Sequence, residues 1–147
     1  MRVSVIGGSE VDEKTARVAE RLGRELGSRG HDVVCGGLGG VMAAVSRGAA
    51  ATGALTIGIL PGEDPAAANP FVEVPIATGI GAARNVLVVR NGEAAIAVDG
   101  ATGTLSEIAH ALDMDRPVAG LDTHDVDGVQ AVETPVEAVD YVEQATE

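Results

Sequence analysis

Residues 98–107 read VDGATGTLSE, from Val98 to Glu107, and they join two segments of different character. The preceding run, Ala94–Val98, is wholly apolar, which is typical of a strand covered on both faces. The following run, Ile108–Leu112, continues with apolar side chains at helical spacing. A strand, a glycine turn and a helix start bring backbone N–H groups and the positive end of a helix dipole together. The stretch therefore predicts a binding site for an anion.

Glu107 is the carboxylate of this stretch with the clearest chemical potential. It stands four residues after Gly103, and a helical side chain leans toward the N-terminus, so we expect it to point back at the turn. There a carboxylate can stabilise an oxocarbenium-like transition state or position a water, as in glycoside cleavage. Residues 104–107 also fit a capping box, in which Glu107 binds only the N–H groups of its own helix. The residues of the turn assigned to ligand or phosphate binding are Asp99, Gly100, Ala101, Thr102, Gly103 and Thr104.

An earlier glycine turn, Gly7-Gly8-Ser9, follows the β-branched run Arg2–Ile6. Apolar residues at helical spacing follow it, from Val11 to Leu26. The turn resembles half of a dinucleotide-binding fingerprint, and we assign its three residues to ligand binding. The alternative is a plain strand-to-helix turn in which Ser9 caps the helix.

A further turn holds four glycines in five positions, between a predicted strand, His31–Cys35, and a predicted helix from Val41 to about Ala51. Each glycine carries an entropic cost that a polar connector avoids, so close approach of the backbone to a ligand is favoured over a connector role. The residues assigned to this contact are Gly36, Gly37, Gly39, Gly40 and Met42. For Met42, packing in the core is the alternative.

Arg84 falls in the first turn of a helix that we predict from about Gly81 to Arg90. A helix dipole disfavours a cation at that position, and an anion bound there would reverse the balance. We therefore assign Arg84 and the adjacent Asn85 to the ligand site. A surface arginine in a salt bridge is the alternative for Arg84.

The remaining apolar runs complete an alternation of strands and helices. Further strands are expected at Leu55–Leu60, Val72–Pro75, Pro117–Gly120 and Val129–Val132, and a closing helix begins after Thr134 with Pro135 at its first position. This alternation predicts an α/β fold, a Rossmann-like, doubly wound parallel sheet with helices on both faces, in one domain of 147 residues. Ligands of such sheets bind at the carboxyl ends of the strands, where all three glycine turns and Arg84 are expected to meet.

The charge and amino-acid composition of the chain limit the classes of molecule that it is expected to bind. The net charge of −12 argues against nucleic acid and anionic membrane, which would repel the chain before contact. Lys14 is the only lysine among ten basic residues, and this bias with the excess of acid predicts adaptation to high salt, with an ordinary acidic domain as the alternative. The start of the chain is too short an apolar run for a signal peptide, so we expect a cytoplasmic protein.

Metal and nucleophile chemistry find little support. The three histidines, His31, His110 and His124, show no paired spacing, so we predict no metal site. Cys35 is the only cysteine and no histidine follows it in an obvious pairing, so a small buried residue is the favoured interpretation.

Taken together, these segments resemble the "Lonely guy"-type (SLOG-type) superfamily of nucleotide-binding proteins, often labelled lysine decarboxylases. The motif of that family is P-G-G-x-G-T-x-x-E; Gly100, Gly103, Thr104 and Glu107 match it, whereas Asp99 and Ala101 depart from it. Residues 36–45 and 56–61 resemble the family's second glycine loop and following strand. The resemblance covers about residues 1–120. A decarboxylase would need a lysine for its pyridoxal phosphate, and Lys14 is predicted on the exposed face of a helix, so we reject that activity.

The resemblance implies two functions for the same site. In the ribohydrolases of the superfamily a paired Arg and Glu release the base of a nucleoside 5′-monophosphate, and Arg84 and Glu107 stand at the matching, catalytic positions. Those enzymes carry Lys after the Arg, where this chain has Asn85. Residues 79–85 read Gly-x-Gly-x-Ala-Arg-Asn, which is closer to the branch that includes molybdenum-cofactor carrier proteins. That branch resembles the enzymes but binds a phosphorylated pterin.

We therefore expect a binding protein for a phosphorylated nucleotide-like or pterin-like molecule. Hydrolysis of a nucleoside monophosphate is the alternative, and a structural domain whose glycine turns are only turns is a third. No cofactor is expected to be required beyond a bound nucleotide or molybdopterin-type ligand. The resemblance also implies a homodimer or homotetramer, with which the Ala-rich helix after Gly40 and the Val-rich helix carrying Arg84 are compatible.

Overall fold

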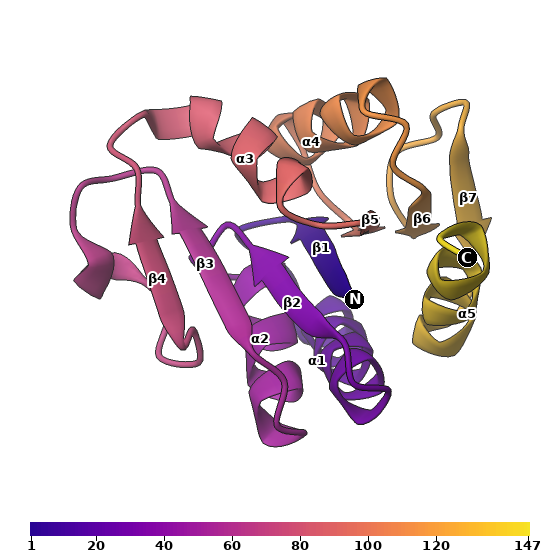
Figure 1. Ribbon diagram of the computed structural model, residues 1–147, viewed down its shortest axis with the longest axis horizontal. Helices are drawn as coiled ribbons and strands as arrows, with labels where there is room; N and C mark the ends of the chain where they lie inside the picture. The colour runs from indigo at the N-terminus through magenta and orange to yellow at the C-terminus, as the bar shows by residue number, and fades with distance from the viewer.

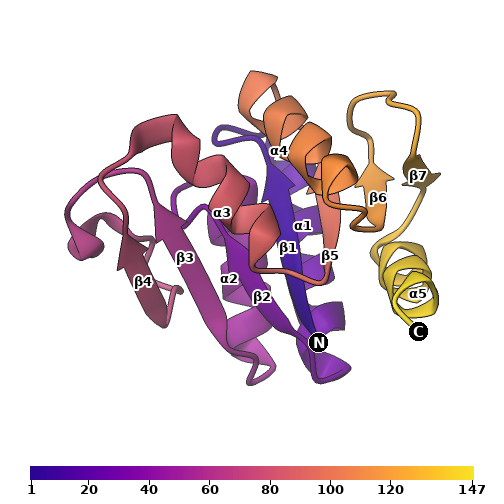
Figure 2. The same ribbon diagram turned by 45° about the horizontal axis from the view of Figure 1, so that its top comes forward.

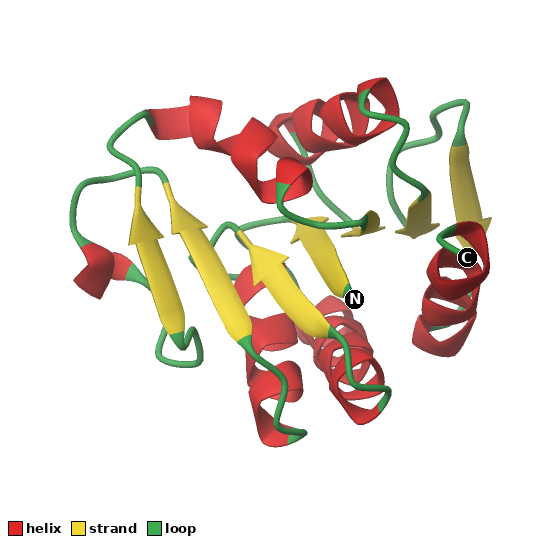
Figure 3. Ribbon diagram, viewed as in Figure 1, coloured by secondary structure: helices red, strands yellow, loops and turns green.

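A computed structural model describes residues 1–147, and its centre is a seven-stranded, fully parallel sheet with the strand order β4-β3-β2-β1-β5-β6-β7. Figure 3 shows how strands and helices alternate along the chain. The strands are β1 (Arg2–Gly7), β2 (Asp32–Cys35), β3 (Thr56–Leu60), β4 (Val74–Ala77), β5 (Ala94–Val98), β6 (Val118–Leu121) and β7 (Val129–Val132). The chain grows outward from β1 to β4 and then returns to the other side of β1. The strand order therefore reverses between β1 and β5, which is the place where doubly wound sheets bind ligands.

Helices cover both faces of the sheet, as the sequence predicts (Figure 1). One face carries α1 (Glu13–Ser28), α2 (Val41–Ala51) and α5 (Pro135–Ala145), and the other carries α3 (Arg84–Arg90) and α4 (Thr102–Asp113). Two short 3-10 turns, Pro65–Ala67 and Gly81–Ala83, flank β4. Turned forward, α3 and α4 lie side by side across β1 (Figure 2). None of these helices has both the length and the apolar character needed to cross a bilayer.

The core has two halves because alternate residues of each strand point to opposite faces. Val3 and Val5 of β1 belong to a cluster of 17 buried residues under α1, α2 and α5. Ile6 of β1 belongs to a cluster of 11 under α3 and α4. All members are Val, Ile, Leu or Ala. The core therefore consists of aliphatic side chains, mostly β-branched in the strands, packed against small and aliphatic side chains of the helices.

The helices α1 and α2 meet backbone to backbone through Gly23 and Gly48. A Cβ on Gly23 would overlap the carbonyl oxygen of Val45, and a Cβ on Gly48 would overlap that of Glu20. The small residues of α2 therefore serve a contact inside the chain. This close crossing fixes the start of α2 relative to the turn that follows β1.

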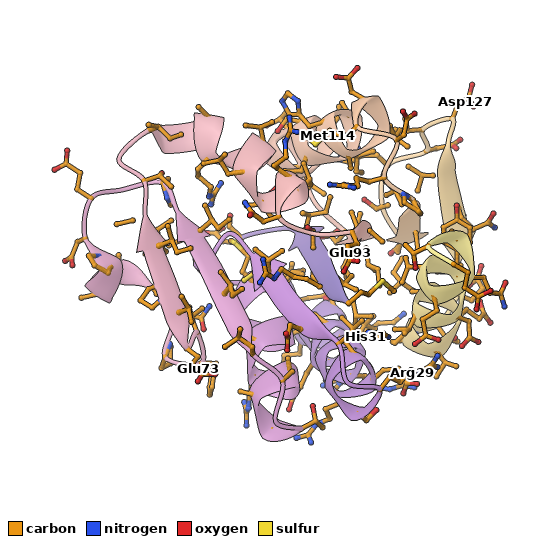
Figure 4. All side chains as sticks on the ribbon, in the orientation of Figure 1. Arg29, His31, Glu73, Glu93, Met114 and Asp127 are labelled. Atoms are coloured by element: carbon orange, nitrogen blue, oxygen red, sulfur yellow. The ribbon has the colours of Figure 1, made fainter.

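Ion pairs connect the terminal helix α5 to the end of α1, in addition to its apolar contacts with the core. Arg29 donates from Nη1 to Asp140 at 2.8 Å and to Glu143 at 3.0 Å, and His31 lies 2.6 Å from Glu143. Figure 4 labels Arg29 and His31 between α1 and α5. Hydrogen bonds to Asp140, Glu25 and Glu143 raise the pKa of Arg29, and the bond to His31 lowers that of Glu143.

The fold class is confirmed, and the structure rules out two of the alternatives that the sequence left open. Ser9 does not cap the first helix: α1 begins at Glu13, and Asp12 is its N-cap, accepting a bond from Thr15 N at 2.8 Å. The turn after β1 is therefore longer than predicted, because Gly8 turns its carbonyl toward Val41 N, at 2.9 Å, before α1 can start. The capping box at residues 104–107 does not form either, because α4 already begins at Thr102, with Ala101 as N-cap.

Candidate functional site

A cavity of about 270 Å³ lies at the carboxyl ends of the central strands, beside the point where the strand order reverses. It receives residues from the turn after β1, the glycine loop after β2, the start of α3 and the start of α4. Arg84 and Gly103, which are 19 positions apart in the sequence, both line it. The lining residues are Val5, Ile6, Gly7, Gly8, Ser9, Gly36, Leu38, Met42, Arg84, Asn85, Ala101, Gly103, Thr104 and Glu107.

Two helices begin at this cavity without a side-chain cap. The N-caps of α2 and α4 are Gly40 and Ala101, neither of which can accept a bond through its side chain, and no acidic residue stands in either first turn. The first bond within α4 runs from Leu105 N to Ala101 O at 3.0 Å, so the N–H groups of Gly103 and Thr104 precede the ladder. The positive ends of two helix dipoles therefore meet at the cavity.

Arg84 supplies the fixed positive charge. Its Nε donates to the carbonyl oxygen of Ile59 at 2.8 Å, and its Nη2 lies 3.5 Å from that of Gly36. These bonds anchor the guanidinium to the carboxyl ends of β3 and β2. Burial lowers the pKa of Arg84, and the charge of Glu107 opposes this shift.

Asn85 holds Arg84 to α4. Its side-chain oxygen accepts a bond from Arg84 Nη1, and its Nδ2 donates to Ser106 Oγ at 3.2 Å. Ser106 Oγ donates in turn to the carbonyl oxygen of Gly103 at 2.7 Å. Asn85 is only 7% exposed, and this buried series of hydrogen bonds connects Arg84 to the glycine turn before α4.

Glu107 lies in the same cavity and is only 7% exposed. Burial raises its pKa to about 7, and the positive charge of Arg84 opposes that rise. With no capping role, the carboxylate faces the cavity from the first turns of α4. A buried acid with a pKa near neutrality, close to an arginine, is typical of a site that transfers protons or binds charged ligands.

The glycine loop after β2 is shaped by backbone contacts. Gly37 and Gly40 have φ angles of 79° and 61°, and a Cβ on Gly40 would overlap the carbonyl oxygen of Gly8. Asn69, beyond β3, donates from Nδ2 to the carbonyl oxygens of Leu38 at 2.9 Å and Gly37 at 3.3 Å. The loop is therefore held from both sides.

Not every residue assigned from the sequence lines this cavity. Those that stand apart from it are Gly37, Gly39, Gly40, Asp99, Gly100 and Thr102. Gly37 and Gly40 shape the loop, and Gly100, at φ 113°, leaves the space that Thr104 fills. Asp99 faces a second cavity. Sequence reasoning missed Val5, Ile6 and Leu38, of which Val5 and Ile6 are buried core residues beneath the cavity and Leu38 is partly exposed; their only signal was their place beside assigned glycines.

Three isolated candidates have other surroundings. Cys35 is fully buried, and burial raises the pKa of its thiol. Lys14 is exposed on α1, as predicted. No three side chains of His, Cys, Asp or Glu gather closely enough to hold a metal ion.

Comparison with known proteins identifies the family of the chain and one similar relative. A family model described as the SLOG cluster4 family matches residues 1–147. A protein of Archaeoglobus fulgidus, described only as an uncharacterized protein, is 45% identical over 142 residues, which is 96% of this chain and 93% of the relative.

Two solved structures are similar over nearly the whole chain. The molybdenum cofactor binding protein of the phototrophic bacterium Rippkaea orientalis superposes with a TM-score of 0.93 at 30% identity, covering 99% of this chain and 97% of its own. The molybdenum cofactor carrier protein of Chlamydomonas reinhardtii gives a TM-score of 0.89 at 30% identity, covering 98% and 96%.

Proposed function

The chain belongs to the SLOG cluster4 family, and from that premise we propose that it binds a phosphorylated small molecule in the cavity that holds Arg84. The observation that carries the proposal is the meeting of two uncapped helix starts with one half-buried arginine. Phosphate is the ligand group that satisfies both, because it accepts several N–H bonds and neutralises the cation. On a chain with a net charge of −12, so local a concentration of donors indicates selection for an anion.

For the ligand as a whole we propose a molybdopterin-type or nucleotide-like molecule that the protein carries. The titles of the two similar structures name the molybdenum cofactor as what those proteins bind or carry. Here the N–H groups at the starts of α2 and α4 would hold its phosphate and Arg84 would neutralise it. Leu38, which is partly exposed, offers apolar contact beside that phosphate. The metal would travel as part of the cargo.

The test is calorimetric titration with sulfate, ribose 5-phosphate and adenosine 5′-monophosphate. Arg84→Gln should weaken binding of each by at least about tenfold, because it removes a half-buried, charge-assisted contact. Arg90→Gln, at the exposed end of the same helix, is the matched control and should leave binding unchanged. Equal affinities in both variants would contradict the proposal.

A second candidate function rests on Glu107. Its raised pKa and its place opposite Arg84 suit a phosphoribohydrolase, in which water adds to the anomeric carbon of a nucleoside 5′-monophosphate. The N-glycosidic bond breaks, the base leaves with a proton, and ribose 5-phosphate is formed. Glu107 would position the water or stabilise the oxocarbenium-like centre, and Arg84 would orient the phosphate. Release of free base that Glu107→Gln abolishes supports the enzyme, whereas binding without turnover supports the carrier.

We also propose that copies of the chain associate through the edge of the sheet at β4, the outer strand in Figure 1. Val74, Ile76 and Ile80 are 39%, 45% and 51% exposed, and from Val74 to Ala83 the sequence has no charge. A second acidic copy can approach only at such an uncharged surface. Light scattering of the wild type and of Ile76→Glu tests this: a monomeric wild type would contradict it.

A further inference from the structure

A second, larger cavity of about 590 Å³ lies on the other side of the turn after β1. It opens over the carboxyl ends of β5, β6 and β7 and is closed on one side by the first turns of α1. Its volume falls within the usual range of small-molecule sites, whereas that of the smaller cavity, about 270 Å³, suits only part of a cofactor-sized ligand. Nothing in the proposed phosphate contacts uses it.

The two cavities share a narrow wall made by Gly8 and Asp99. Gly8 lines the smaller cavity and Asp99 the larger, and a Cβ on Gly8 would lie only 3.2 Å from an Asp99 carboxylate oxygen. The absence of a side chain on Gly8 therefore leaves space beside Asp99 at the boundary between the two cavities. A ligand of moderate length can reach across it.

The floor of the larger cavity is apolar and aliphatic. Its apolar lining residues come from α1 and from the last three strands with their connections: Val18, Val98, Leu121, Val126, Val129, Ala131 and Val132. Such a floor suits the face of a flat ring, which gains contact area while losing little conformational freedom.

The rim of the larger cavity is acidic. Asp99 and Asp122 follow directly after the paired strands β5 and β6, and Asp99 N donates to the carbonyl oxygen of Leu121 at 3.1 Å, so the two aspartates are neighbours. Asp125 and Glu133 add further carboxylates, against one lysine and one histidine among the lining residues. A phosphate would be repelled here, and a group rich in N–H donors would be attracted.

A metal ion is a poorer occupant than an organic donor. No three carboxylates or histidines of the chain gather closely enough to hold one. Two neighbouring carboxylates beside an aliphatic floor match instead a ring that carries adjacent N–H and NH₂ groups on one edge. The 2-amino-4-oxopyrimidine edge, which guanine and pterin share, has that arrangement.

We propose that one ligand spans both cavities, with its phosphate in the smaller and an N–H-rich heterocycle on the aliphatic floor of the larger, held by Asp122 and Asp99. This inference rests on the proposed phosphate site and specifies the other half of the ligand. It assigns selectivity to the acidic rim, and it explains why the rim and the phosphate donors lie on opposite sides of a single glycine.

The test compares three probes by calorimetry: ribose 5-phosphate, inosine 5′-monophosphate and guanosine 5′-monophosphate, which add first a ring and then its amino group. Wild-type protein should bind the guanosine nucleotide at least about tenfold more tightly than either other probe. Asp122→Asn and the cavity-filling Ala131→Trp should remove that preference while leaving the affinity for ribose 5-phosphate unchanged.

The chain offers a matched control for the aspartate variant. Asp99, Asp115 and Asp122 are the only non-glycine residues with positive φ, at 53°, 55° and 49°, and asparagine tolerates that conformation equally. Asp115 is exposed at the end of α4, outside both cavities, so Asp115→Asn should retain the preference for guanosine.

The outcomes separate the two proposals. If ribose 5-phosphate and sulfate do not bind, the phosphate site is wrong and this inference fails with it. If they bind but the guanosine preference is absent, or survives in both Asp122→Asn and Ala131→Trp, the phosphate site stands and the larger cavity is not the second half of the ligand site.

Discussion

Four helices of this chain begin in two contrasting ways. At α1 and α5 the protein satisfies its own helix starts: Asp12 accepts from Thr15 N at 2.8 Å and Thr134 from Glu137 N at 3.2 Å, with Glu13 and Glu137 in the first turns. At α2 and α4 no side chain caps the helix and no acidic residue stands in the first turn. The first pair is satisfied by side chains of the fold, and the second pair provides the N–H donors on which the proposed phosphate site depends. The comparison teaches that missing caps can mark a site as clearly as residues that are present.

The largest effect is expected at the start of α2, which relies on backbone contact in place of a cap. Gly40→Ala should lower the free energy of unfolding by about 4 kcal/mol, because a Cβ would overlap Gly8 and the φ of 61° is strained for alanine. Gly62→Ala, in open space, is the control and should cost well under about 1 kcal/mol. Chemical denaturation measures both; similar losses would show that the contact with Gly8 is dispensable.

The next effect concerns the carboxylate inside α4. Because the pKa of Glu107 is raised from 4.5 to about 7, its stabilising contribution is complete below about pH 4.5 and is lost as the pH rises through about 7. Wild-type protein should therefore lose stability relative to Glu107→Gln by on the order of 3 kcal/mol between about pH 4.5 and 8. Parallel unfolding curves for the two proteins across this range would mean that the carboxylate is solvated.

The same titration should control anion affinity. Ionised Glu107 repels an anion in the shared cavity, so sulfate, whose own charge is constant near neutrality, should bind about tenfold more weakly at pH 8 than at pH 6. In Glu107→Gln the affinity for sulfate should be flat. Calorimetry at several pH values decides, and a pH dependence that the variant retains would assign the effect to another group.

An aspartate at the N-cap of α4, like Asp12 at the N-cap of α1, would convert an uncapped helix start into a capped one. Ala101→Asp should stabilise the protein by about 1 kcal/mol and weaken sulfate binding by at least about tenfold, because its carboxylate occupies the place of the anion. Ala101→Asn caps the helix without the charge, so it should retain more of the binding. A melting temperature that rises in both variants, with binding lost only in the first, would sharpen the comparison.

The smallest effect is expected at a start that serves only the fold. Thr134→Ala should cost about 1 kcal/mol and leave sulfate affinity unchanged, since α5 lies on the face opposite α3 and α4. Thr134→Ser, which keeps the hydroxyl, should recover most of that stability. Any loss of sulfate binding in Thr134→Ala would blur the distinction between the two kinds of helix start.

Much of the fold followed from local patterns. The apolar run Ala94–Val98 and the glycine turn after it predicted β5 and the start of α4, because a doubly covered strand has no polar face to hide. The sequence left open whether Ser9 caps the first helix, because Ser9 and Asp12 are equally good caps. The choice between them depends on a tertiary bond, from Val41 N to Gly8 O, that the local sequence does not reveal.

The smaller cavity was largely predictable because its residues sit on strand ends, and parallel strand ends share an edge. The role of Asn85 between Arg84 and Ser106 was not, since it depends on α3 lying beside α4. The larger cavity was missed because its walls come from α1 and β7, more than 100 residues apart in the chain. In the sequence its aspartates resemble those of an ordinary acidic loop, and only the pairing of β5 with β6 brings Asp99 and Asp122 together.

The two hydrogen bonds from Asn69 to the glycine loop have a consequence for the rate at which a ligand would exchange at the proposed site. These bonds fasten the glycine loop to the connection before β4, so the loop is already ordered when a ligand arrives and has no lid-like motion to complete. Little entropy is then left to lose on capture, and departure is not delayed by a slow opening step. At the proposed phosphate site, such a pre-ordered loop would favour rapid capture and rapid release of a ligand.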